Sequence, residues 1–152
     1  MGLISFIKNA GAKLFGKKEE EAPVAEKETL KAAVLLAHVQ ALGLPFKQLT
    51  VLLAGAKVTI KGQVENQIDA EKIALAVGNV DGVDEVDNLM EVAVKVPESR
   101  YHTVVSGDWL SKIAKTYYSD ATKFDVIFEA NKPMLKDPDE IYPGQVLRIP
   151  NL

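Results

Sequence analysis

The side chains that most often carry chemistry are few in this sequence of 152 residues. There are no cysteines, which excludes disulfides, thiolate metal sites and thiol nucleophiles. The two histidines, His38 and His102, fall in a predicted helix and a predicted strand that are far apart in the sequence. A transition-metal site usually needs more nitrogen or sulfur ligands than two histidines supply. Because glycine-rich phosphate loops and the Gly-x-Ser-x-Gly motif are also missing, we expect that the protein is not an enzyme.

Acidic residues are concentrated over positions 65–91, where eight of them accompany a single base. Asp81 and Glu85 have the alternate spacing of a calcium loop. However, Val83 interrupts that series, and Val86 stands where a calcium loop requires glycine, so we do not expect a calcium site. The simplest interpretation is a solvated acidic face, which attracts cations in general without selecting K⁺ over Na⁺.

Backbone carbonyls are a second source of cation ligands. K⁺ sheds its water readily, and several converging carbonyl dipoles can replace its hydration shell without a formal charge. Such a site needs carbonyls that are left unpaired at helix ends or in irregular backbone. The sequence offers two such places, the interruption at Ala10-Gly11-Ala12 and the turn from Gly78 to Val83. The glycines of that turn are equally typical of an ordinary helix stop and turn.

The elements around these two places form a first module over residues 26–96. Their apolar residues recur first at helical spacing, then in alternation, and then at helical spacing again. The expected arrangement is two helices on one face of a small sheet. In chain order we expect an N-terminal helix in 1–16 that packs on the module, a linker in 17–25, a helix in 27–42, a hairpin over 49–60, a helix from Asn66 to Gly78 and a strand over 86–96.

A second module follows the short linker 97–100 and occupies residues 101–150. Its strands, over 101–105 and 146–149, flank two helices, the first of which Asp108 would cap. The strands lie too far apart in the sequence for a simple hairpin, but they can pair if the helices stack over them. The expected fold class is therefore α+β, with two small domains.

The second module resembles a LysM domain. Gly107-Asp108 and Leu110 stand at the family's spacing before Ile113-Ala114, and residues 141–150 read Ile-Tyr-Pro-Gly-Gln-x-Leu-x-Ile-Pro. One departure is Trp109, where the family usually has threonine or serine. The resemblance implies a shallow groove that holds N-acetylglucosamine polymers, and Trp109 would either stack on a sugar ring or pack into the protein. The groove residues carry over to Gly107, Asp108, Trp109, Asn131 and Ile141.

The first module resembles a BON domain. The resemblance rests on the element order, on Gly62 in the second strand and on the turn Val80-Asp81-Gly82-Val83 before the last strand. A BON module followed by a LysM module, with Ala76-Val77-Gly78-Asn79 and the run from Ile127 to Lys136, is similar to the family of bacterial cytoplasmic potassium-binding proteins. This resemblance covers essentially the whole chain. It implies a K⁺ binder or sensor that changes shape when the ion binds.

The resemblance also implies where the ion would lie. The N-terminal carbonyls would meet those of the turn after the second helix, and the ion would staple the N-terminal helix onto the BON module. The ligand positions hold aliphatic residues and glycine because the ligands are backbone oxygens. They are the carbonyls of Ile7, Ala10, Ala12, Gly78, Val80 and Val83.

Composition limits the remaining partners. The net charge of −3 argues against a nucleic-acid partner, since phosphate binding needs a surplus of Lys and Arg. The N-terminus lacks the basic start of a secretory signal, so we expect a cytoplasmic protein. We also expect it to be a monomer. Two alternatives stay open, a peptidoglycan-binding LysM protein and BON-mediated membrane association. Membrane association is disfavoured because Lys8 and Lys13 are the only basic residues of the N-terminal segment.

Overall fold

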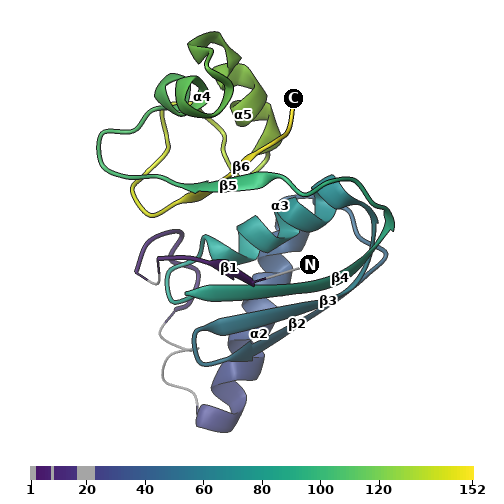
Figure 1. Cartoon of the computed structure of the whole chain (residues 1–152). Coiled ribbons are helices and arrows are strands. Elements are labelled where there is room, and N and C mark those ends of the chain that lie inside the picture. The colour runs from purple at the N-terminus through teal and green to yellow at the C-terminus, as the bar shows by residue number, and fades with distance from the viewer. Residues whose placement is uncertain (1–2, 8, 17–22) are drawn as a thin grey trace. The chain divides into compact units, whose positions relative to one another are not determined.

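A computed structural model describes residues 3–7, 9–16 and 23–152. The chain forms two compact units, Met1–Val96 and Pro97–Leu152, each with its own sheet and helices (Figure 1). The predicted α+β class is confirmed. Residues 17–22 of the predicted linker lie outside the described part of the chain.

The sheet of the first unit has four strands in the order β1-β4-β3-β2. The predicted hairpin is confirmed, since β2 and β3 pair antiparallel through a turn at Gly55, whose φ of 63° suits glycine. β3 and β4 pair parallel because the chain crosses over between them. The strands are β1 (Leu3–Ser5), β2 (Gln48–Ala54), β3 (Lys57–Asn66) and β4 (Glu85–Val94).

Two helices cover one face of this sheet, as expected (Figure 1). α2 (Val24–Ala41) contacts β2, and α3 (Gln67–Gly78) contacts β3 and β4. Every second residue of the central strands is buried beneath the helices, while the residues between them face away. Asn66 does precede α3, but its side chain caps no backbone amide and instead donates to Asp69 Oδ2 at 3.3 Å.

The prediction of an N-terminal helix is wrong. Residues Leu3–Ser5 form β1, which pairs antiparallel with β4. The side chains alternate here, since Phe6 is buried and Ile4 half-buried while Leu3 and Ile7 are exposed. A short helix with glycine close behind it is marginal by itself. Pairing along the edge of β4 satisfies the backbone and buries Phe6, so the tertiary partner outweighs the helical spacing.

In the second unit, β5 (Arg100–Thr103) pairs antiparallel with β6 (Val146–Ile149), which confirms the predicted pairing. Between them lie α4 (Leu110–Tyr118), the 3₁₀ turn η1 (Ala121–Lys123) and α5 (Phe124–Ala130). Apolar side chains from the helices and β6 share one core. The expected cap Asp108 is not the cap of α4, because Trp109 occupies that position without a side-chain hydrogen bond.

Candidate cation site

The segment after β1 runs beside the turn between α3 and β4, within the first unit. The Phe6 amide donates to the Asp84 carbonyl at 2.8 Å. Further along, the Ala12 amide donates to the Asn79 carbonyl at 3.1 Å, and the Asp81 amide returns a hydrogen bond to the Ala12 carbonyl at 2.8 Å. The two segments expected to carry the ligands are therefore in direct backbone contact.

Glycines make this close approach possible. A Cβ atom at Gly78 would overlap the ring of Phe6, which is only 7% exposed. At Gly11, φ is +97° and a Cβ atom would lie 2.5 Å from the carbonyl oxygen of Asn79. Any side chain at either position would push the two segments apart, so both glycines have a packing role beyond that of a helix stop or turn.

A second aromatic ring holds the far end of the segment. Phe15 lies against the turn, 3.6 Å from where a Cβ atom of Gly82 would stand. The ammonium of Lys31, on α2, lies 4.8 Å from the centre of the Phe15 ring. Phe6 and Phe15 thus pack on the two glycines of the turn, Gly78 and Gly82.

The expected ligand carbonyls differ in whether they already accept a hydrogen bond. The carbonyl of Ile7 accepts from the Ala10 amide, that of Ala12 from the Asp81 amide, and that of Val80 from the Val83 amide. Each keeps a second lone pair. Within the described ranges, the remaining three carbonyls accept no hydrogen bond, and they belong to Ala10, Gly78 and Val83.

The side chains of the turn explain why its carbonyls are available. Val80 and Val83 are fully buried, so their apolar side chains anchor the turn in the core and shield its peptide groups from solvent. Gly78 ends α3, and the last carbonyls of a helix carry its negative partial charge. Asp81 and Asp84 in the same turn add to the negative field.

These features fit K⁺ better than a divalent ion. Neutral carbonyl ligands suit a large, weakly hydrated cation. Calcium, magnesium and zinc prefer carboxylate, imidazole or thiolate ligands. No group of three or more such side chains that could hold a metal occurs in the described part of the chain.

Sequence reasoning missed several residues that shape this region. The sequence alone assigns no role at this site to Phe6, Phe15, Asn79 or Lys31. The signal that could have identified them is the presence of large aromatic residues in one segment and of glycines in another. That signal can be interpreted only once β1 is known to bring Phe6 over Gly78.

In the second unit, two of the expected groove residues are occupied by structural hydrogen bonds. The Asn131 side chain is buried, donating to the carbonyls of Ile127 and Arg148 and accepting from the Arg148 amide at 2.8 Å. Asp108 accepts from His102 Nε2 at 2.9 Å and from the Val105 amide at 3.1 Å. Burial raises the pKa of Asp108, but these hydrogen bonds outweigh it and hold the pKa below its usual value.

The other three groove residues remain at the surface. Trp109 is 57% exposed, which excludes the alternative that it packs into the core of its own unit. The ammonium of Lys112 lies 5.3 Å from the centre of its ring. Gly107 is exposed, and Ile141 is half-buried against the core. A ligand surface at this end would therefore depend on Trp109 and neighbouring backbone.

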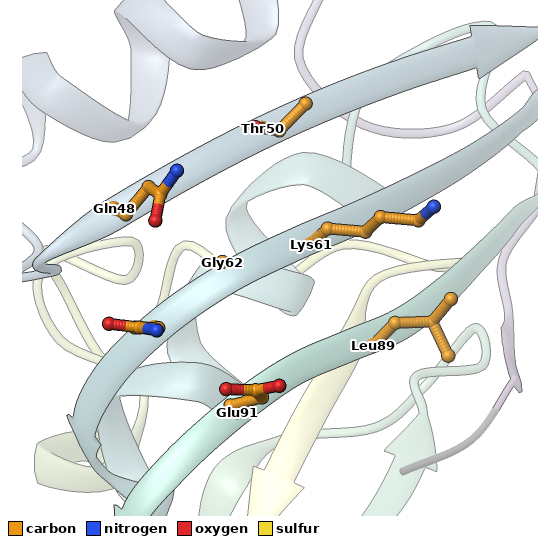
Figure 2. A pocket seen from close by; sticks show the side chains of 7 residues that line it. Gln48, Thr50, Lys61, Gly62, Leu89 and Glu91 are labelled. Atoms are coloured by element: carbon orange, nitrogen blue, oxygen red, sulfur yellow. The ribbon is translucent and has the colours of Figure 1, made fainter.

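The face of the first unit's sheet opposite the helices bears a hollow of about 380 Å³. Figure 2 shows side chains of Gln48, Thr50, Lys61, Leu89 and Glu91 standing on three neighbouring strands around it. The lining mixes both charges, amides, a hydroxyl and one leucine. It contains no nucleophile paired with a base, so it does not have the constellation of a catalytic site.

No helix in the described ranges is long and apolar enough to cross a membrane.

Comparison with known proteins agrees with both modules. The BON domain family matches residues 27–94, and the LysM domain family matches residues 102–150. The potassium binding protein Kbp of Escherichia coli O6:H1 is 42% identical over 155 residues, covering 99% of each chain. An uncharacterized protein of Deinococcus radiodurans is 37% identical over 111 residues, covering 66% of this chain and 43% of its own length. The two predicted domain resemblances are confirmed.

Proposed function

Because the chain belongs to the family of the potassium binding protein Kbp, we propose that it binds K⁺ in the cytoplasm and changes conformation when it does so. One structural observation supports the proposed location of the ion. Carbonyls from the N-terminal segment and from the end of α3 lie on two segments in direct backbone contact, and those of Ala10, Gly78 and Val83 accept no hydrogen bond within the described part of the chain.

The proposed ligand set is the six carbonyls of Ile7, Ala10, Ala12, Gly78, Val80 and Val83. An ion shared by both segments would add favourable interactions only when the N-terminal segment is docked. It would therefore shift the equilibrium toward the docked state. β1 is only three residues long, so its own pairing with β4 is weak and leaves room for such a shift.

This arrangement also gives a reason for discrimination between K⁺ and Na⁺. Neutral dipoles held by a rigid frame favour the ion that loses its water at lower cost, which is K⁺. The frame here is built by the buried Val80 and Val83 and by the ring-on-glycine contacts of Phe6 and Phe15. Carboxylates nearby would raise the affinity for both ions alike.

The test is a titration of the full chain with KCl and with NaCl at constant ionic strength, followed by the amide resonances of residues 3–15 and 78–84. We expect saturable shifts with KCl and much weaker ones with NaCl. Removal of residues 1–16 should abolish the K⁺ response while the resonances of both units keep their dispersion. A truncated chain that binds K⁺ with unchanged affinity would refute the proposed ligand set.

Glycan binding is a second candidate function, supported by the exposed Trp109 beside Gly107. Pull-down with intact murein sacculi tests it. Saturable retention that is lost in Trp109→Ala, but kept in a Phe124→Ala control, would establish it. The membrane alternative has lost part of its basis, since residues 3–5 form a strand and not an amphipathic helix.

A further inference from the structure

Among the described residues of the first unit, none forms a layer over the sheet face opposite the two helices. This face, called the open face below, consists of the strand residues that point away from α2 and α3. Three leucines stand on it, namely Leu3, Leu52 and Leu89, with exposed fractions of 58%, 49% and 45%. Antiparallel and mixed sheets often leave one face in water, but such a face is usually polar. Leucines on three different strands call for an explanation.

The strand registers arrange the open face in rows that run across the sheet. β4 contributes mostly acidic residues, and β3, its neighbour, contributes the lysines. The rows, each written from the β1 side to the β2 side, are Ser5-Glu85-Lys57-Ala54, Leu3-Asp87-Thr59-Leu52, Leu89-Lys61-Thr50 and Glu91-Gln63-Gln48.

We propose that the open face binds a second copy of this chain in a weak, symmetric dimer. The reason is that the row through Glu85 and the row through Asp87 are each complementary to their own reversed order. A twofold axis lying in the face, along the strands and between β3 and β4, places β3 of one copy over β4 of the other and keeps the rows aligned. Lys57 then meets Glu85 of the second copy, and Leu52 meets Leu3 of the second copy.

The charges also decide the direction of the axis. An axis across the strands would set β4 against β4 and bring the carboxylates of Glu85, Asp87 and Glu91 against one another. Like charges directly opposite are unfavourable. With the axis along the strands, Glu91 meets Gln63 of the second copy, and Lys61 lies over Leu89, from where its ammonium can reach an acidic neighbour.

The area of the open face limits the affinity of the proposed dimer. Four strands about 4.8 Å apart, with rows about 6.6 Å apart, cover roughly 400–500 Å² on each copy. A stable interface of standard size buries about 800 Å² on each partner. We therefore expect monomer at micromolar concentration and dimer only well above it. This goes beyond the monomer that the sequence predicts, and it is linked to the ion site only through β1, which supplies Leu3 and Ser5 to the face.

The experiment uses complementary charge variants of the full chain, K57E and E85K. Lys57 and Glu85 also form an exposed ion pair within one copy, 3.7 Å long, so both variants lose that pair equally. In a dimer of K57E, glutamate faces Glu85, and in a dimer of E85K, lysine faces Lys57. Sedimentation equilibrium from about 10 μM to about 1 mM should show at least a tenfold weaker dimer for each variant alone.

Mixing the two variants is the decisive arm. In the mixed dimer the introduced glutamate faces the introduced lysine, and the native Glu85 faces the native Lys57, so association should return to within about threefold of the wild type. Leu52→Asp should abolish association, while Lys27→Glu on α2 is the matched control and should leave it unchanged.

Two results would overturn the inference. One is an apparent molar mass of the wild type that stays at the monomer value up to about 1 mM. The other is a mixture of K57E and E85K that sediments like its components. Circular dichroism of each variant verifies that the fold is retained, so a lost association reports on the interface.

Discussion

Phe6 is the residue whose truncation tests the docking of the N-terminal segment most directly. Its ring is 7% exposed and occupies the space above Gly78, while its amide donates to the Asp84 carbonyl. The Phe6→Ala variant keeps the backbone hydrogen bond and removes the ring. Replacing a buried phenylalanine by alanine costs about 3–5 kcal/mol, and we take the lower value because this ring lies at the edge of the core.

The expected loss of K⁺ affinity follows from population arithmetic. If K⁺ binds only the docked segment, the apparent dissociation constant rises as the docked fraction falls. A loss of about 3 kcal/mol in docking free energy corresponds to a factor of about 150 in the docking equilibrium. This factor is the upper limit of the loss in K⁺ affinity. If docking of the wild-type segment is favourable by about 1 kcal/mol, the docked fraction falls from about five in six to about one in thirty, and K⁺ affinity falls about 25-fold.

The assay is a KCl titration at constant ionic strength, read by calorimetry and by amide resonances of the turn 78–83. Phe124→Ala is the matched control, since that ring is 40% exposed and belongs to the other unit. Phe6→Leu should restore most of the affinity, because leucine retains apolar bulk over Gly78. A Phe6→Ala protein that is folded and binds K⁺ within about twofold of the wild type would refute the docking argument.

Three further predictions concern other residues. The Gly11→Ala substitution places a Cβ atom on a residue with a φ of +97°, 2.5 Å from the Asn79 carbonyl oxygen. K⁺ affinity should therefore fall at least tenfold, while the Lys13→Ala control should change little in the same titration. Asn131→Ala leaves the backbone of Arg148 and Ile127 without its hydrogen bonds, and urea unfolding of the second unit should show a loss of about 2–4 kcal/mol, unlike Asn151→Ala at the exposed terminus. The pKa of Asp108 is lowered in the folded chain, so its contribution to stability is present above the ordinary value of about 3.9 and is lost as pH falls through the lower folded pKa. Asp108→Asn should therefore flatten the acid limb of the stability curve below about pH 4, and an unchanged limb would contradict this assignment.

Much of the fold is predictable because its signals are local. The hairpin at Gly55, the helix that ends at Gly78 and the closing run Ile141 to Pro150 can each be read from a few neighbouring residues. The domain resemblances are strong for the same reason, since motif spacing is a property of the chain alone. The absence of cysteines and the scarcity of histidines likewise exclude whole classes of site by composition alone.

The candidate sites depend more heavily on tertiary structure. Helix spacing and strand alternation are both satisfied by the residues around Phe6, and only the free edge of β4 decides between them. Asn131 matches a groove position by motif, but in the structure its side chain is buried and hydrogen-bonded to the backbone of Arg148. In both cases the deciding partner is distant in sequence, so no local pattern can carry the information.

The kind and order of the two domains, and the aliphatic character of the proposed ligand positions, can be read from the amino-acid sequence without further information. The meeting of segments far apart in the chain cannot, and it depends on the folded protein: β1 on β4, Phe6 on Gly78, and the rows of the open face. The physical reason is that hydrogen-bond pairing and apolar burial are properties of pairs of segments. A sequence pattern describes only one member of each pair.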